Sequence, residues 1–228
     1  MQPFATIYAR AAERKGGEKN LLANLPFFDS PAKLRKKPDS FYLAEMTAAV
    51  FRSGFVWKVI ENKWPGFEQA FHNFDPKILA LMSDEQWEAL ESDTRIVRHR
   101  AKIYSVRENL VFVHDLIHDY GSVGKMIADW PEQDLIGLLA KLKKEGNRLG
   151  GMTGQYFLAY CGKSCFITSP DVVRCIQEAG VEIADNPTSQ RDLRAVQETF
   201  NVWHEESGLP YRHLSAIAAR SVGENYYA

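Results

Sequence analysis

Two short segments contain the residues best suited to chemistry, the glycine-rich Leu149-Gly150-Gly151-Met152-Thr153-Gly154 and the Thr168-Ser169-Pro170-Asp171 that follows it. Glycines remove side chains from a loop, so its main-chain N–H groups can approach an anion, and a helix that starts there adds its positive dipole end. A DNA phosphate is one anion of this kind. We therefore expect the first segment to bind a phosphate backbone through Gly150, Gly151, Thr153 and Gly154.

Asp171 stands at a predicted helix start, because Ser169 is a favourable N-cap residue and Pro170 suits the first turn. Its carboxylate could lie beside a bound nucleotide and act on it. An acid in the first turn also complements the helix dipole and needs no catalytic explanation. Both interpretations remain open.

The composition is that of an ordinary folded protein without a targeting signal. The 228 residues are 45% hydrophobic and carry a net charge of -1. No uninterrupted run of about 18 apolar residues occurs, and the first residues lack the basic and apolar regions of a secretory signal. We therefore expect a cytoplasmic protein with no membrane segment. Three cysteines, an odd number, argue against a disulfide framework and a four-cysteine iron–sulfur cluster.

Basic residues gather around the glycine-rich segment, although the whole chain is nearly neutral. Against one nearby acid, Glu145, this region has Lys141, Lys143, Lys144, Arg148 and Lys163. Such a patch fits a face that binds nucleic acid, while scattered solvated charges give similar counts in proteins that bind none. A second basic run, Lys33-Leu34-Arg35-Lys36-Lys37-Pro38, predicts an exposed loop, either simply solvated or in contact with a phosphate.

Helical periodicity dominates the chain, and strand alternation is scarce. Apolar residues recur three and four apart over residues 43–59, 67–71, 84–90, 101–117, 133–142, 155–160, 172–178, 191–205 and 211–219. Prolines and glycines mark breaks between these segments, including one at Trp64-Pro65-Gly66. We therefore predict an all-α protein built from short helices.

Three motifs follow one another in a recognisable order. Ser53-Gly54-Phe55-Val56-Trp57 runs to Phe71-His72-Asn73-Phe74-Asp75-Pro76, residues 96–103 contain an Arg-His-Arg block, and residues 142–146 lead into the glycine-rich segment. Over about residues 1–176 their order resembles the DNA-3-methyladenine glycosylase I family of helix-hairpin-helix DNA repair enzymes. The resemblance implies an all-α, two-lobed domain, which we expect to occupy residues 1–228. Residues 181–228 lie beyond the resemblance, and we expect helices there to complete the fold. It also implies an enzyme that flips a methylated purine out of DNA and hydrolyses its bond to deoxyribose.

Two aromatic residues acquire a role through this resemblance. Trp57 matches the family's base-pocket tryptophan, and Tyr8 falls where a stacking tyrosine lies. Methylation at a ring nitrogen makes the purine cationic and a good leaving group, and aromatic faces suit a cationic guest. Without the resemblance, both residues would be interpreted as core aromatics.

The chain departs from the family at the residue that hydrogen-bonds the damaged base. Ala49, eight residues before Trp57, stands where the family carries a glutamate. Glu45 lies four residues earlier on the same helical face and could replace that group from one turn away, or it could face solvent. A catalytically idle protein that binds damaged DNA is therefore an alternative to the enzyme. A protein that keeps only the scaffold is a third.

The family's zinc site is also incomplete. Its N-terminal cysteine is missing, Ala9 and Asp171 stand where histidines would be, and only Cys175 remains. Four ligands cannot be assembled from these positions, so we predict no zinc and no other cofactor.

The resemblance extends to the reaction. In the wider superfamily an aspartate at this helix start assists water attack or stabilises the sugar cation, which implies a catalytic role for Asp171. A lysine that attacks the sugar would follow the glycine-rich segment, where this chain has Gly154-Gln155-Tyr156. We therefore expect a monomer that removes a base from DNA without cutting the strand. His99, between two arginines, is expected on a partly exposed helix surface with no chemical role.

Overall fold

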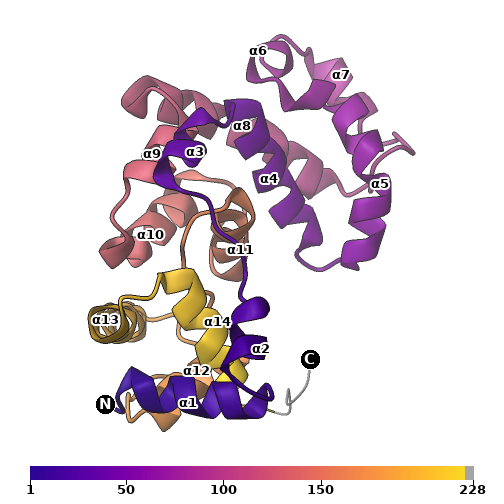
Figure 1. The fold of residues 1–228 in the computed structure, drawn as a ribbon. Helices are drawn as coiled ribbons and strands as arrows, with labels where there is room; N and C mark the ends of the chain where they lie inside the picture. Colours follow the sequence, from indigo (N-terminus) through magenta and orange to yellow (C-terminus); the bar gives the residue numbers. More distant parts are fainter. Residues whose placement is uncertain (224–228) are drawn as a thin grey trace. The chain divides into compact units, whose positions relative to one another are not determined.

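The computed structural model describes residues 1–223 as helices joined by short turns (Figure 1). The all-α prediction is confirmed, since no strand occurs between residues 1 and 223. The chain divides into two compact units. The terminal unit comprises Met1–Asp29, Pro131–Leu138 and the segment from Gly162 onward, and the central unit comprises Ser30–Trp130 and Leu139–Cys161.

The central unit contains α3 (Pro31–Lys36), α4 (Asp39–Arg52), α5 (Trp57–Ala70), η1 (His72–Phe74), α6 (Pro76–Leu79), α7 (Asp84–Ala89), α8 (Arg100–Tyr120), α9 (Val123–Asp129) and α11 (Met152–Cys161). The terminal unit contains α1 (Phe4–Arg14), α2 (Glu18–Ala23), η2 (Glu132–Asp134), α12 (Pro170–Glu178), α13 (Gln190–Ser207) and α14 (Tyr211–Ser221). The helix α10 (Leu135–Glu145) begins in the terminal unit and ends in the central one. Within the described chain, every helix is too short or too polar to span a bilayer.

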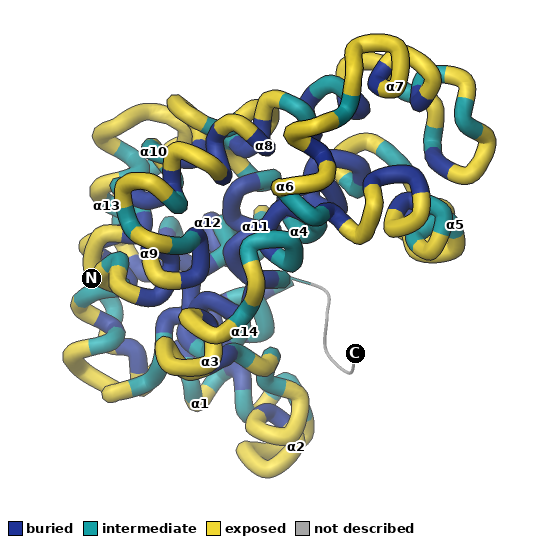
Figure 2. Tube along the Cα trace, turned by 90° about the horizontal axis from the view of Figure 1, so that it is seen from above, coloured by how far each residue is buried: buried dark blue, intermediate teal, exposed yellow. Residues whose placement is uncertain are grey.

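The helix α4 lies in the core of the central unit, where it packs against α8 and α11. Its residues from Met46 to Phe51 are all buried, and buried positions are dark blue in Figure 2. Close packing on several sides restricts how far a helix can shift. Side chains at the C-terminal end of α4 are therefore presented from a firm support.

The basic run at residues 33–38 is largely exposed, as the sequence predicted, but it is not a loop. Most of it belongs to α3, where Ser30 is the N-cap and its hydroxyl accepts a hydrogen bond from Lys33 N, while Pro31 occupies the first turn. Leu34 is buried, so this short helix is held by tertiary packing on one face. Because most residues of the run are basic, the sequence pattern did not indicate that Leu34 would be buried.

The break predicted at Trp64-Pro65-Gly66 was also wrong, because α5 continues through Pro65. A proline inside a helix costs about 3 kcal/mol, so packing must compensate. The Trp64 ring stacks on Phe67 and Phe74 with ring centroids 5.4 and 5.5 Å apart. Aromatic packing therefore keeps α5 continuous across the proline.

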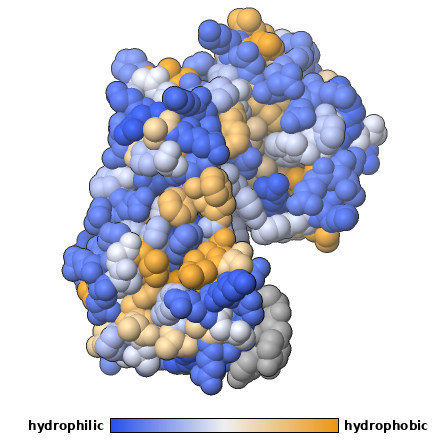
Figure 3. Space-filling view, viewed as in Figure 1, coloured by the Kyte–Doolittle hydropathy of each residue, from blue (hydrophilic) through white to orange (hydrophobic). Residues whose placement is uncertain are grey.

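Hydrophobic side chains reach the surface between α4 and α5 (Figure 3).

The Phe-His-Asn-Phe-Asp-Pro block forms a strained turn between α5 and α6. His72, Asn73 and Phe74 have φ angles of 48, 54 and 57°, a left-handed conformation that is unfavourable for non-glycine residues. Asp75 then caps α6, with its Oδ1 accepting a hydrogen bond from Lys77 N at 2.9 Å. This block therefore forms the turn that ends α5 and starts α6.

In the terminal unit, α1 packs on α14 and α12 packs on α14. Arg14 of α1 caps the end of α14, since its Nε donates to Arg220 O at 3.1 Å and its Nη2 donates to Val222 O and Gly223 O. The last carbonyls of a helix have no partner within it. A guanidinium on α1 therefore satisfies the C-terminal end of α14.

Candidate functional site

A solvent-open hollow of about 120 Å³ lies in the central unit where α4 and α11 meet. Its lining residues are Ala49, Arg52, Ser53, Trp57, Met152, Thr153, Tyr156 and Tyr160. Two residues predicted separately from the sequence, Trp57 and Thr153, therefore share one hollow.

Three aromatic rings form one wall of this hollow. Trp57, which is 43% exposed, meets Tyr156 edge-on with ring centroids 5.6 Å apart and an interplanar angle of 86°. Tyr156 and Tyr160 stack with an interplanar angle of 20°, since i and i+4 positions lie on one face of α11. A flat ligand can contact both ring faces and ring edges at such a wall.

Lys102 fixes the main chain that leads from α4 to Trp57. Its Nζ donates hydrogen bonds to Val50 O at 2.7 Å, to Phe51 O at 3.4 Å and to Ser53 O. These are carbonyls at the C-terminal end of α4, which lack partners within the helix. Burial lowers the pKa of the Lys102 ammonium, and the nearby charge of Arg148 lowers it further. Lys102 is thus a positioning residue for the hollow.

The Arg-His-Arg block has a structural explanation as well. His99 is the N-cap of α8, and its Nδ1 accepts a hydrogen bond from Lys102 N at 3.4 Å. Its exposure is intermediate, and its ring meets Phe55 edge-on, with ring centroids 6.0 Å apart. The histidine therefore starts the helix that carries Lys102.

The glycine-rich segment connects α10 to α11 as the sequence predicted, and one side chain of α8 holds the turn before it. Asn109 Oδ1 accepts from Asn147 N at 2.7 Å, and Asn109 Nδ2 donates to Asn147 O at 3.1 Å. Arg148 and Gly151 then adopt φ angles of 60 and 57°. The turn is thereby fixed to α8 before α11 begins.

The predicted backbone-binding residues differ in their surroundings. Gly151 is exposed, and Gly150 and Thr153 are half-buried at the start of α11. Gly154 is buried within α11, where a side chain would collide with Leu149 O, so glycine there permits close packing. The first turn of α11 presents main-chain N–H groups beside the hollow.

Glu45 lies one turn before Ala49 on α4 and is half-buried, but it is not among the residues that line the hollow. Burial raises the pKa of its carboxyl group, while the charges of Arg52 and Lys37 oppose that shift. The structure therefore shows a partly desolvated carboxyl group near the hollow.

Tyr8 and Asp171 belong to the terminal unit. The Tyr8 hydroxyl donates to Glu18 Oε1 at 2.6 Å, which raises the Tyr8 pKa to about 12. Asp171 occupies the first turn of α12 behind the N-cap Ser169, as predicted. A Cβ at Gly223 would lie 2.7 Å from Asp171 Oδ1, so the carboxylate packs against that main chain. Asp171 makes no side-chain hydrogen bond within residues 1–223.

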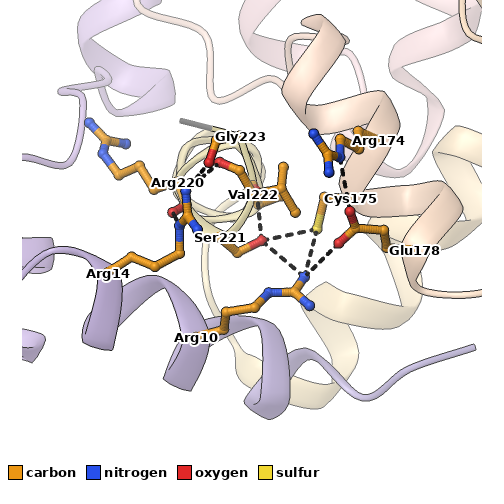
Figure 4. A network of polar contacts seen from close by, with 10 residues as sticks. Arg10, Arg14, Arg174, Cys175, Glu178, Arg220, Ser221, Val222 and Gly223 are labelled. Atoms are coloured by element: carbon orange, nitrogen blue, oxygen red, sulfur yellow. Dashed lines mark hydrogen bonds and ion pairs between the residues drawn. The ribbon is translucent and has the colours of Figure 1, made fainter. Parts of the chain in front are cut away.

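The residues around Cys175 do not fit a zinc ion. The Cys175 Sγ lies 3.3 Å from Ser221 Oγ and 4.0 Å from Arg10 Nη2, and that nitrogen is 3.7 Å from Glu178 Oε2 (Figure 4). A guanidinium cannot ligate a metal, and its charge opposes a cation. No group of three or more His, Cys, Asp or Glu residues suited to a metal occurs in the described part of the chain. A protein-only polar network therefore joins α1, α12 and α14.

Sequence reasoning missed five residues of this site: Arg52, Lys102, Asn109, Tyr156 and Tyr160. The spacing of the two tyrosines, four apart directly after the glycine-rich segment, was a usable signal. Arg52 follows Ala49 by three residues and so shares its helical face. Lys102 and Asn109 act on distant main-chain atoms, for which the sequence offers no local pattern.

Known proteins share the sequence or the fold of parts of this chain. The sequence model of the methyladenine glycosylase family matches residues 34–153, more than half of the 228-residue chain. This range is narrower than the expected 1–176 and leaves Tyr8 and Asp171 outside. Among solved structures, 3-methyladenine DNA glycosylase I from Staphylococcus aureus has a similar fold, with a TM-score of 0.50 and 21% identity over 63% of this chain and 83% of that one.

Two curated relatives align over a shorter stretch. DNA-3-methyladenine glycosylase 1 of Escherichia coli (strain K12) is 36% identical over 58 residues, and DNA-3-methyladenine glycosylase of Haemophilus influenzae is 33% identical over 58 residues. Each alignment covers 25% of this chain and 31% of the relative. Because the family model covers more than half of the chain, the chain belongs to the methyladenine glycosylase family.

Proposed function

We propose that this protein is a DNA glycosylase that hydrolyses the N-glycosidic bond of alkylated purines, the class that includes 3-methyladenine. The observation that carries the proposal is the hollow itself, in which three aromatic rings stand beside the start of α11. A base turned out of the duplex needs a stacking wall, and the adjoining DNA backbone needs main-chain donors. Both occur here within one unit.

In this proposal Trp57 and Tyr8 stack the everted base, and Gly150, Gly151, Thr153 and Gly154 bind the DNA backbone. Asp171 stabilises the developing sugar cation or orients water, which suits an acid without a side-chain hydrogen bond. Glu45 assists at the base edge from one turn away. The protein acts as a cytoplasmic monomer and needs no cofactor.

Base removal without strand cleavage is part of the proposal. A strand-cutting step requires a lysine amine that attacks the sugar. No lysine lines the hollow, and Lys102 beneath it donates to the main chain of α4. The product is then an abasic site in an intact strand.

A catalytically idle protein that binds damaged DNA is the second candidate. It is favoured by Ala49, which places a methyl group where the sequence comparison expected a carboxylate, and by the absence of Glu45 from the lining. This candidate predicts binding to methylated duplex DNA without release of a base.

The deciding experiment incubates the protein with methylated duplex DNA and measures free methylpurine by chromatography, with strand breaks scored before and after alkali. Base release with alkali-dependent breaks supports the proposal. Binding without release supports the idle protein, and no salt-dependent binding contradicts both.

Asp171→Asn should then lower the rate of base release at least about 100-fold, the scale of one charge-stabilising group. Asp192→Asn is the matched control, since Asp192 also lies in the first turn of a helix, α13. Unchanged release by Asp171→Asn would remove Asp171 from the reaction.

A further inference from the structure

Arg52 is the only charged residue among those that line the hollow. Its guanidinium lies over the Tyr160 ring, with Cζ 4.8 Å from the ring centroid. Its Nε is buried and has no hydrogen-bond partner. Arg52 makes neither a hydrogen bond nor an ion pair with residues 1–223.

A buried donor without a partner is unfavourable in a folded protein, and a ligand that accepts its hydrogen bond would remove that cost. The neighbouring carboxyl group, Glu45, affects Arg52 only through its charge and forms no ion pair with it. Ala49, between them on the same face of α4, offers a methyl group and no polar atom. The guanidinium is therefore the group that would meet the polar edge of a flat molecule stacked in the hollow.

We infer that the hollow selects purines with a carbonyl oxygen at C6, the guanine type, over purines with an amino group there. This inference rests on the proposed function and names its preferred substrate class. An arginine can donate two hydrogen bonds to O6 and N7 of a guanine. Adenine has an amino donor in place of O6, which would face the donors of Arg52 and leave both groups unsatisfied.

The two 3-methylpurines provide a controlled comparison. The methyl group at N3 leaves the O6/N7 edge of 3-methylguanine and the N6/N7 edge of 3-methyladenine free. Both methylated nucleosides carry the same positive charge. Any repulsion between Arg52 and that charge therefore cancels when the two are compared. The remaining difference is the group at C6.

The experiment measures release of 3-methylguanine and 3-methyladenine from one methylated duplex, each expressed as kcat/KM. The wild-type protein should favour 3-methylguanine. In Arg52→Gln this ratio should fall about 10-fold, which corresponds to about 1.4 kcal/mol. Arg52→Lys keeps the charge but cannot donate two parallel hydrogen bonds, so its ratio should lie between the wild-type ratio and that of Arg52→Gln.

Arg100→Gln is the matched control, because Arg100 also lies over a tyrosine, Tyr104, at 5.6 Å, but outside the hollow. Its ratio should equal the wild-type ratio. Circular dichroism and the thermal midpoint establish that each variant is folded.

A wild-type preference for 3-methyladenine would overturn the inference and leave the proposed function standing, as would an unchanged ratio in folded Arg52→Gln. If Arg52→Gln does not fold, calorimetry of the wild-type protein with each free base decides, and equal Kd values overturn the inference. Absence of both release and binding of either base would overturn the proposed function together with the inference.

Discussion

The hollow of the central unit and the polar network of the terminal unit use arginine in opposite ways. In the network, Arg10 Nη2 contacts Glu178, Ser221 and Cys175 at once. In the hollow, Arg52 has the Tyr160 ring beside it and no hydrogen-bond or ion-pair partner within residues 1–223. The Nε atoms of both arginines are buried without a hydrogen-bond partner, so the two differ in the rest of the guanidinium. Hydrogen-bonded polar groups stabilise a fold. The contacts of Arg10 therefore support the terminal unit, while Arg52 is left to meet the ligand that we propose for the hollow.

The strongest test of this comparison removes the support beneath the hollow. Lys102→Met should lower the free energy of unfolding by about 3 kcal/mol, because buried carbonyls of α4 lose their donor. Urea denaturation followed by tryptophan fluorescence measures the change. Lys58→Met on the exposed surface of α5 is the control and should change stability by less than about 0.5 kcal/mol. A loss below about 1 kcal/mol for Lys102→Met would show that this amine does not hold the site.

The network should respond to loss of Arg10 and not to loss of metal. Arg10→Met should lower the free energy of unfolding by about 1–2 kcal/mol, since it breaks the hydrogen bonds to Ser221 and Cys175 and a partly buried ion pair with Glu178. Arg174→Met, which removes only the exposed pair with Glu178, should cost less than about 0.5 kcal/mol. A chelator should leave the thermal midpoint of the wild-type protein unchanged. A lower midpoint after chelation would mean that a metal contributes to this unit.

Binding at the hollow should depend on the shape of the loop that starts α11. Gly151→Glu should weaken duplex DNA binding about 10-fold, or about 1.4 kcal/mol, because it adds a negative charge where a phosphate is proposed to bind. Gly151→Asn is the control, since asparagine tolerates the φ of 57° and adds no charge. Fluorescence anisotropy at several salt concentrations measures both variants. Equal affinity for the two would exclude this loop as the phosphate anchor.

The smallest effect concerns the pH dependence of stability. Burial raises the pKa of Glu45 above its ordinary value of 4.5, so the folded chain keeps this proton to a higher pH than the unfolded chain. Stability is therefore lost as pH rises from 4.5 through the folded pKa. Glu45→Gln removes this loss and should be more stable than wild type above that window, with no difference below it. Denaturation at pH 4 and pH 7 makes the comparison, and a destabilised variant at pH 7 would contradict it.

Much of the fold was predictable because it follows local rules. The N-cap at Ser169, the proline after it and the turn between α10 and α11 are all specified by neighbouring residues. The errors at Pro65 and at residues 33–38 have one cause. In both places tertiary contacts, the rings on Trp64 and the burial of Leu34, outweighed a local signal.

The candidate site was predictable only in part. Trp57 and Thr153 belong to sequence motifs, so their importance was visible before their proximity was known. Asn109 and Lys102 contact main-chain atoms 38 and up to 52 residues away in sequence, at Asn147 and Val50. Such partners depend on how helices cross, and no local pattern specifies a crossing.

The chain's three cysteines are all buried and unbridged. Burial raises the pKa of Cys165 to about 12 and raises that of Cys175, so reactive thiolate is scarce at neutral pH. The folded protein should consequently resist alkylating reagents and mild oxidants. A cysteine engineered at position 153 would then be the fast-reacting thiol, and a fluorophore attached there could report arrival of a ligand without altering the native sulfur atoms.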